Sequence, residues 1–391
     1  MENEFIQFER VVTRGLLLGH VFATIVLGYL PICLALNGET IPGRLIGIAA
    51  IFCLLIPLAL WLLLKRQQRR AGYFTIASLT TGALVAYTVA SIFAPSGKSA
   101  DANLTQDFYE NAKFRATSLA NMVPEIDQLK LGTYLFEHLD PFINGQKAEN
   151  LRNNIVKIYK EARSDPEFVQ VGSSLGYCYN EIIGDELDFA HCYIYIPKHL
   201  GRDQYPALIF LHGSLGNFKA YLWILKSIAD TEGFAIIAPT YGAGNWNRDI
   251  GQSVLKRTKE MCKSNPLIDE ERLFLGGISN GGKGVTREIA ANGNQYKGFL
   301  LISPVLEDTI MQKVTFAQNI LNKPILLLHG ETDRRIPLNF IQYAASTLKI
   351  FSDKVTFRIY PDQDHFLFFN ERDWCSSVIR EWIQQYNILD E

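Results

Sequence analysis

Long apolar runs fill the first 95 residues of the chain, at residues 15–36, 45–64 and 73–95. The middle run is twenty residues long, and its one hydrogen-bonding side chain is the indole of Trp61. An α-helix of that length spans roughly 30 Å of hydrocarbon. The pattern therefore predicts a membrane anchor at residues 1–95 with three transmembrane helices in contact with lipid. Of these, the third run is the least hydrophobic.

Basic residues predict the orientation of this anchor, because cytoplasmic loops are enriched in Lys and Arg. Two basic residues precede the first run and four lie between the second and third, whereas the first loop carries one: Arg10 and Arg14; Lys65, Arg66, Arg69 and Arg70; and Arg44. The N-terminus is therefore expected in the cytoplasm. After three crossings, the remainder of the chain is expected on the extracytoplasmic side, whether periplasmic, extracellular or lumenal.

Residues 96–174 have a different pattern. A polar linker at residues 95–101 is followed by apolar residues at helical spacing, which end at Asp165 and Pro166. This region is predicted to be a helical linker or a cap, and periodicity alone does not distinguish a spacer, a cap over a site and a surface resting on lipid.

From residue 175 to residue 391, short apolar strands alternate with amphipathic helices. This alternation predicts an α/β domain with a mostly parallel sheet and helices on both faces, whose ligands bind at the carboxyl ends of the strands. The expected strands are 192–196, 207–211, 235–238, 273–275, 298–302, 325–328 and 355–360.

Two cysteines, Cys178 and Cys192, flank a predicted hairpin centred near Asp185. In an oxidising compartment this arrangement would allow a disulfide. Two buried free thiols are the alternative.

Composition excludes several functional classes. The chain has 391 residues with 38 basic and 40 acidic side chains, and this balance excludes a nucleic-acid binder that relies on phosphate neutralisation. An apolar content of 48% excludes wholesale disorder. Neither a Cys/His cluster with metal-ligand spacing nor a dinucleotide fingerprint occurs, so no metal and no cofactor are expected.

A Gly-x-Ser-x-Gly string follows the expected strand that ends at residue 275 and precedes a helix. Ser279 is its central residue, flanked by Gly277 and Gly281. Such a strand-to-helix turn lifts a serine hydroxyl into a cleft, because glycines avoid the collisions that Cβ atoms would cause. Ser279 is therefore the candidate nucleophile.

A serine nucleophile needs a base and an acid, in the chain order Ser, acid, His. Asp333 and His365 each follow a later expected strand, so parallel strands would bring them to the same sheet edge as Ser279. Glu307 and Asp308 are the rival acids.

Backbone N–H groups are expected to stabilise the oxyanion. The loop from His212 to Asn217 would supply the N–H of Ser214, and the residue after the nucleophile would supply the N–H of Asn280. His212 and His329 are interpreted as structural rather than as second bases.

A nucleotide-binding loop is the rival interpretation of the same glycines. Gly277, Gly282 and Lys283 match most of G-x-x-x-x-G-K-[ST], but Gly284 lacks the hydroxyl that binds Mg²⁺. That interpretation also leaves Asp333 and His365 without a role.

With these motifs assembled, residues 190–391 resemble the α/β-hydrolase family, and most closely its dienelactone hydrolase and prolyl-oligopeptidase branch. The resemblance lies in the run from Ser279 to Gly282 and in the acid loop from Gly330 to Pro337. The His-Gly-Ser loop at 212–214 departs from the Tyr-Gly-Gly type of prolyl oligopeptidases, and the upstream region is too short for their propeller.

The sequence therefore predicts a membrane-anchored serine hydrolase that cleaves an ester, thioester or related acyl bond of a small-molecule or lipid-like substrate. One alternative is a prolyl-oligopeptidase-like peptidase, and another is a non-catalytic binding ectodomain with the same fold. The apolar run from Phe366 to Phe369 would suit a lipid-derived acyl group, and a core strip under the final helix explains that run equally well.

Overall fold

The computed structural model describes residues 19–22, 24, 27–64, 68–97, 102–109, 113–182, 191–386 and 389. Contacts within the chain divide it into two compact units. The first comprises residues 1–94 and 116–134, and the second comprises residues 95–115 and 135–391.

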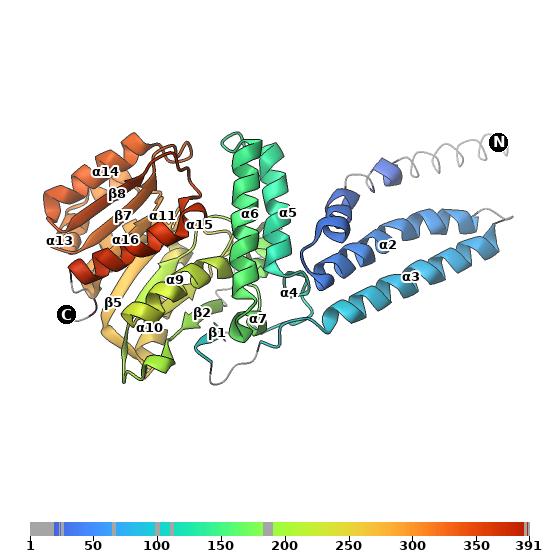
Figure 1. Ribbon diagram of the computed structural model, residues 1–391, viewed down its shortest axis with the longest axis horizontal. Coiled ribbons are helices and arrows are strands. Elements are labelled where there is room, and N and C mark those ends of the chain that lie inside the picture. The colour runs from blue at the N-terminus through green and yellow to red at the C-terminus, as the bar shows by residue number, and fades with distance from the viewer. Residues whose placement is uncertain are drawn as a thin grey trace. The chain divides into compact units, whose positions relative to one another are not determined.

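Among the described residues, two helices of the first unit are long and apolar enough to cross a membrane, namely α2 (Ile41–Leu64) and α3 (Arg69–Ser91) (Figure 1). They pack through small residues: Ala49, Ala83 and Ala86 form a core cluster, and Gly82 lies against the ring of Phe52. Close contact through such residues is typical of helix pairs in membranes.

The prediction of three transmembrane helices is not confirmed. In the first apolar run, 15–36, the structure describes a shorter apolar helix at Leu27–Asn37, and the start of the run lies outside the described residues. Leu27–Asn37 falls short of the roughly 20 residues that a crossing requires.

The rest of the first unit contains α4 (Leu119–Met122) and the first part of α5 (Glu125–Leu139). The buried carboxylate of Asp127 accepts hydrogen bonds from the Glu39 N–H and the Thr40 hydroxyl, directly before α2 begins. Asp127 thus satisfies donors at the N-terminal end of that helix, where the helix dipole favours negative charge.

The second unit is built on one eight-stranded sheet with the order β1-β2-β4-β3-β5-β6-β7-β8 (Figure 1). Strands β1 and β2 are antiparallel additions at one edge, and the pairs from β4 to β8 are parallel. The strands are β1 (Leu104–Phe108), β2 (His191–Tyr195), β3 (Tyr205–Leu211), β4 (Ala235–Pro239), β5 (Ile268–Ile278), β6 (Tyr296–Ile302), β7 (Ile325–Gly330) and β8 (Val355–Tyr360).

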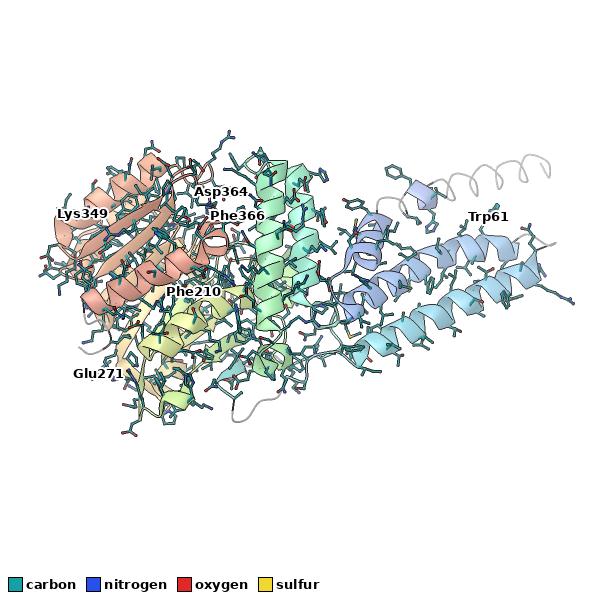
Figure 2. The ribbon with its side chains drawn as sticks, viewed as in Figure 1. Trp61, Phe210, Glu271, Lys349, Asp364 and Phe366 are labelled. Carbon is teal, nitrogen blue, oxygen red and sulfur yellow. The ribbon has the colours of Figure 1, made fainter. Side chains whose placement is uncertain are left out.

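Helices cover both faces of this sheet. All seven residues of β3 are buried. Ile209 and Leu211 belong to the main core, while Phe210, which is labelled in Figure 2, packs against the rings of Tyr221 and Phe368. The helices are α6 (Gly145–Ala162), α7 (Pro166–Gln170), α8 (Leu175–Ile182), α9 (Lys219–Glu232), α10 (Asp249–Ser264), α11 (Gly281–Asn292), α12 (Asp308–Met311), α13 (Val314–Ile320), α14 (Leu338–Phe351), α15 (Leu367–Asn370) and α16 (Arg372–Gln385), with 3₁₀ turns at Lys198–Leu200 and Gly293–Gln295.

Two expectations for this unit are wrong. Strand β1 lies within the region expected to be helical, because a short edge strand with mixed polar residues gives no clear alternation. Cys178 does not lie in a strand of the expected hairpin but in α8, where Leu175 and Cys178 are both buried, and the expected turn near Asp185 lies outside the described residues. Both cysteines are free thiols.

Candidate active site

Ser279 lies between the end of β5 and the start of α11, in a left-handed backbone conformation with φ of +51°. Its N–H donates to the Ile302 carbonyl at 3.0 Å, and its own carbonyl accepts from the Val305 N–H at 2.8 Å. A non-glycine residue in this conformation carries strain of about 1–3 kcal/mol, which the surrounding hydrogen bonds offset. The turn therefore holds the hydroxyl in one direction.

The flanking glycines are required by close backbone contacts. A Cβ atom at Gly281 would lie 2.2 Å from the Leu211 carbonyl oxygen, and one at Gly277 would lie 2.7 Å from the Gly281 carbonyl carbon. Both distances are well inside van der Waals contact, so only glycine fits at either position. This is the geometry of the nucleophile elbow.

His365 hydrogen-bonds to both other candidate residues. Its Nε2 lies 2.9 Å from the Ser279 Oγ, and its Nδ1 lies 2.7 Å from the Asp333 Oδ2. The second oxygen of Asp333 accepts hydrogen bonds from the backbone N–H groups of Arg335 and Ile336, at 2.8 and 3.0 Å. The three side chains that follow β5, β7 and β8 thus form one continuous hydrogen-bonded series.

The environment of Asp333 favours its ionised form. Burial acts to raise the pKa of this carboxyl, but the hydrogen bond and charge of His365 and the N–H of Ile336 outweigh it, and the pKa is lowered. An ionised Asp333 accepts a hydrogen bond from the Nδ1–H group of His365, which leaves the Nε2 lone pair free to accept the proton of the serine hydroxyl.

The two rival acids, Glu307 and Asp308, form hydrogen bonds with other residues. Both carboxylate oxygens of Glu307 bind the Arg287 guanidinium, at 2.5 and 2.9 Å. Asp308 accepts from the Gln312 side chain at 2.9 Å. Among the described residues, neither acid contacts His365.

The glycine loop after β3 lies directly beside Ser279. A Cβ atom at Gly213 would lie 3.2 Å from the Ser279 Cβ, and the Asn280 side-chain amide donates to the Ser214 Oγ at 2.8 Å. Within the described part of the chain, the backbone N–H groups of Ser214 and Asn280 have no acceptor. Two donors are therefore available next to Ser279, and the side-chain link between them was not predicted from the sequence.

His212 and His329 lie behind the site. His212 is fully buried, and its Nδ1 donates to the Gly213 carbonyl at 2.7 Å while its Nε2 accepts from the Tyr241 N–H at 3.0 Å. The Nε2 of His329 donates to the Ile336 carbonyl at 2.9 Å. Burial lowers the pKa of His212 to about 4 and also lowers that of His329, so both rings are neutral. They stabilise the site loops through these hydrogen bonds.

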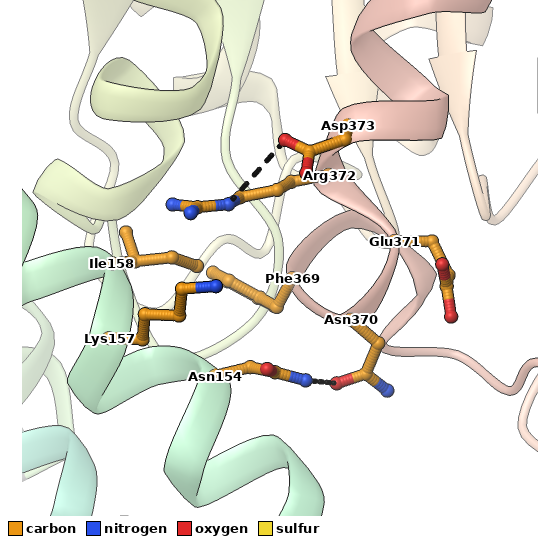
Figure 3. A pocket seen from close by; sticks show the side chains of 8 residues that line it. All are labelled: Asn154, Lys157, Ile158, Phe369, Asn370, Glu371, Arg372 and Asp373. Carbon is orange, nitrogen blue, oxygen red and sulfur yellow. Dashed lines mark hydrogen bonds and ion pairs between the residues drawn. The ribbon is translucent and has the colours of Figure 1, made fainter.

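Helix α6 contacts the segment 364–373, which contains His365. Lys147 lies 3.5 Å from Asp364, and Asn154 donates to Asn370 at 3.1 Å. Figure 3 shows a small polar pocket between α6 and this segment, which does not include the three hydrogen-bonded residues. It is lined by Asn154, Lys157, Ile158, Phe369, Asn370, Glu371, Arg372 and Asp373.

A second contact joins the region before α6 to the acid loop. Arg335 forms an ion pair with Asp140, and its guanidinium lies 5.7 Å from the ring of Phe142 and 5.2 Å from that of Phe366. Sequence reasoning missed this contact, because nothing in the pattern indicates which residue 195 positions away an arginine will meet.

The run after His365 is core. Leu367 and Phe368 are fully buried and Phe369 is nearly so, while Phe366 is partly exposed beside the site (Figure 2). The burial of these three side chains supports the core explanation of the run rather than a wall for a lipid chain. Among the described residues, no group of three His, Cys, Asp or Glu side chains could hold a metal ion.

Comparison with known proteins shows similarity to hydrolases. Residues 248–383, which include Ser279, Asp333 and His365, match the phospholipase/carboxylesterase family model. Over 225 residues the chain is 24% identical to dipeptidyl-peptidase 5 of Porphyromonas gingivalis, a match that covers 45% of this chain and 32% of that protein. The chain thus spans about a third of the length of this relative.

Solved structures of two kinds are similar to half of the chain. Est1E from Butyrivibrio proteoclasticus matches at 15% identity with a TM-score of 0.41, over 50% of this chain and 93% of that one. An acylaminoacyl peptidase of Pyrococcus horikoshii matches at 16% identity with a TM-score of 0.40, over 50% and 39%. The mostly parallel sheet and the strand-to-helix turn at Ser279 are those of the α/β-hydrolase fold, and the proteins to which this chain is similar include esterases and peptidases.

Proposed function

We propose that this protein is a membrane-anchored serine hydrolase that cleaves an ester, thioester or related acyl bond through an acyl-enzyme. The observation that carries the proposal is the hydrogen-bonded series from Ser279 through His365 to Asp333, at 2.9 and 2.7 Å. Such a series turns a weakly nucleophilic hydroxyl into one that attacks carbonyls at neutral pH.

In the first half of the reaction, the Ser279 Oγ attacks the carbonyl carbon of the substrate while its proton moves to the His365 Nε2. The carbonyl oxygen becomes an oxyanion, which the N–H groups of Ser214 and Asn280 stabilise. His365 then gives the proton to the leaving group as the carbonyl–leaving-group bond breaks. Asp333 keeps the imidazole oriented and stabilises its charged form.

In the second half, water takes the place of the leaving group. Its proton moves to His365, its oxygen attacks the acyl carbon, and the same donors stabilise the second oxyanion. The proton then returns to the Ser279 Oγ as the acid product departs, which restores the enzyme.

Residues 1–95 anchor this activity in a lipid bilayer, and the length and composition of α2 and α3 support that role. The orientation proposed from the basic loops leaves the N-terminus in the cytoplasm and the second unit on the extracytoplasmic side. Residues 135–174 act as a cap beside the site, as the contacts of Asp140 and Lys147 with the site loops support.

The decisive experiment compares wild-type protein and Ser279→Ala, both full-length in detergent, on a panel of p-nitrophenyl esters, thioesters, lipids and peptides. The variant should lose turnover and labelling by a fluorophosphonate, while its thermal unfolding is unchanged. Undiminished hydrolysis by Ser279→Ala would contradict the proposal. A wild-type protein that neither turns over any substrate nor reacts with the fluorophosphonate would favour the non-catalytic ectodomain.

A peptidase is the second candidate, and the match to dipeptidyl-peptidase 5 favours it. The same panel separates the two activities. Cleavage of aminoacyl or dipeptidyl amides at rates comparable with ester cleavage would establish the peptidase, since amides are the harder bond to break.

A further inference from the structure

The loop that carries Ser214 is itself supported by a second loop, residues 241–246, which we call the backing loop. The Leu215 N–H donates to the Ala243 carbonyl at 3.1 Å. A Cβ atom at Gly244 would lie 2.3 Å from the Gly213 carbonyl oxygen, so the two backbones are in direct contact. The position of Ser214 therefore depends on the position of the backing loop.

The loop carrying Ser214 needs this support because its backbone is strained. Leu215 has a φ of +73° and Gly216 a φ of +117°, both in the left-handed region. A residue with a side chain costs about 1–2 kcal/mol in this conformation. The hydrogen bond to Ala243 acts at Leu215 itself.

One carboxylate holds the backing loop. Glu181, in α8, accepts hydrogen bonds from the Ala243 N–H, from the Asn245 side-chain amide at 2.9 Å and from the Arg248 guanidinium at 3.2 Å. Its side chain is 11% exposed, so solvent screens these charge-assisted bonds only partly. The three donors come from a stretch of six residues, and Glu181 thereby fixes the path of that stretch.

Helix α8 also contacts the Ser214 loop directly. A Cβ atom at Gly216 would lie 2.9 Å from the Leu175 Cδ2 and 3.3 Å from the Cys178 Cβ. The same helix therefore borders the Ser214 loop on one side and, through Glu181, fixes the backing loop on the other.

We propose that Glu181 is a positioning residue that sets the oxyanion donors, acting through Ala243 and Leu215 on the N–H of Ser214. The inference rests on the proposed function. Because the donors meet a full negative charge only in the transition state, a displaced Ser214 weakens the transition state more than the bound substrate. Loss of Glu181 should therefore lower kcat and leave KM nearly unchanged.

The test uses full-length protein in detergent, with Glu181→Ala, Glu181→Gln and the control Glu149→Ala, which removes an exposed glutamate of α6. We expect Glu181→Ala to lower kcat by about 10-fold to 100-fold with KM within about twofold, below the loss of about 10²–10³ for a deleted oxyanion donor. Glu181→Gln keeps one acceptor oxygen and should lose less, and Glu149→Ala should match the wild type.

A transition-state analogue supplies a readout that a purely structural role would not move. Affinity for a trifluoromethyl ketone, which forms a tetrahedral adduct with Ser279, should fall by the same factor as kcat/KM. The pH profile of kcat/KM should keep its shape, since His365 and Asp333 are not touched. If Glu181→Ala fails to fold, as circular dichroism would reveal, Glu181→Gln should still lower kcat at nearly constant KM, by a smaller factor.

Three results would overturn the inference: kinetics of Glu181→Gln and Glu181→Ala equal to those of Glu149→Ala, a rise in KM at constant kcat, or an unchanged affinity for the ketone. Failure of the proposed function looks different. In that case the wild-type protein itself shows no turnover and no adduct with the ketone.

Discussion

Two buried histidines make the second unit less stable as pH falls below about 6.5. His191 in β2 bonds through Nδ1 to the Thr240 hydroxyl at 2.9 Å, and aromatic rings surround it. His212 donates from Nδ1 to a carbonyl and accepts at Nε2 from a backbone N–H. A proton added to the Nε2 of His212 would face another donor, so the fold accommodates only the neutral ring.

The size of the effect follows from the pKa values. Burial lowers the pKa of His191 to about 3 and that of His212 to about 4, from an ordinary value of 6.5. Below 6.5 the unfolded chain binds a proton at each site and the folded chain does not, so stability falls as pH falls. At about pH 5, which is roughly 1.5 units below the ordinary pKa, each histidine lowers the free energy of unfolding by about 2 kcal/mol. The two together lower it by about 4 kcal/mol.

Other ionisable groups also contribute to the pH dependence of stability, and the direction of each contribution follows from the direction of its pKa shift. His329 adds to the loss, because burial lowers its pKa as well. Asp127 in the first unit acts in the opposite sense, since burial raises its pKa. Asp333 has a lowered pKa, so its contribution is present above 3.8 and is lost only below that value. The contribution of one histidine is therefore measured as the difference in pH dependence of stability between the wild type and the variant that lacks it.

The assay is thermal unfolding of full-length protein in detergent at pH 8 and pH 5, followed by tryptophan fluorescence. His191→Gln and His212→Gln should each be less stable than wild type at pH 8, because hydrogen bonds are lost. Each should also reduce the drop between pH 8 and pH 5 by about 2 kcal/mol, or roughly 5 °C in Tm. His199→Gln, at an exposed position, is the control. The reasoning is refuted if both variants keep the full wild-type drop, or if the control removes as much of it.

Two further predictions concern the site. Asp333→Asn should keep the fold but lower kcat by about 10³–10⁴, because the amide favours the wrong histidine tautomer; a loss below tenfold in steady-state kinetics would remove Asp333 from the mechanism. Gly281→Ala should destabilise the protein by about 3 kcal/mol or more, since its Cβ would meet a backbone oxygen at 2.2 Å. Gly132→Ala in α5, where a Cβ meets nothing within 4 Å, should instead be stabilising by about 0.5–1 kcal/mol. Equal unfolding temperatures of the two variants would contradict the elbow geometry.

Local patterns sufficed to predict the parallel part of the sheet. Buried parallel strands appear in a sequence as short apolar runs, and β3 to β8 each contain one. Parallel strands also end at one edge of the sheet, which is why Ser279, Asp333 and His365 could be brought together from their positions after three strands. Their hydrogen bonds at 2.7 and 2.9 Å agree with that expectation.

Patterns of this kind fail where long-range contacts decide the structure. Strand β1 forms because β2 offers an open edge, and its own residues alternate too weakly to predict it. Cys178 was expected in a hairpin, but the spacing of Leu175 and Cys178 suits a helix as well as a loop, and packing against Gly216 decides between them.

Three contacts missed from the sequence join the helical region before β2 to loops near the site. Glu181 binds the backing loop, Asp140 pairs with Arg335 beside Asp333, and Lys147 lies near Asp364 beside His365. Each contact pairs a charged side chain of that region with a loop next to a candidate catalytic group. A helical region that served only as a spacer would have no reason to meet the loops of all three groups, so its contacts favour a cap that helps to set the geometry of the site.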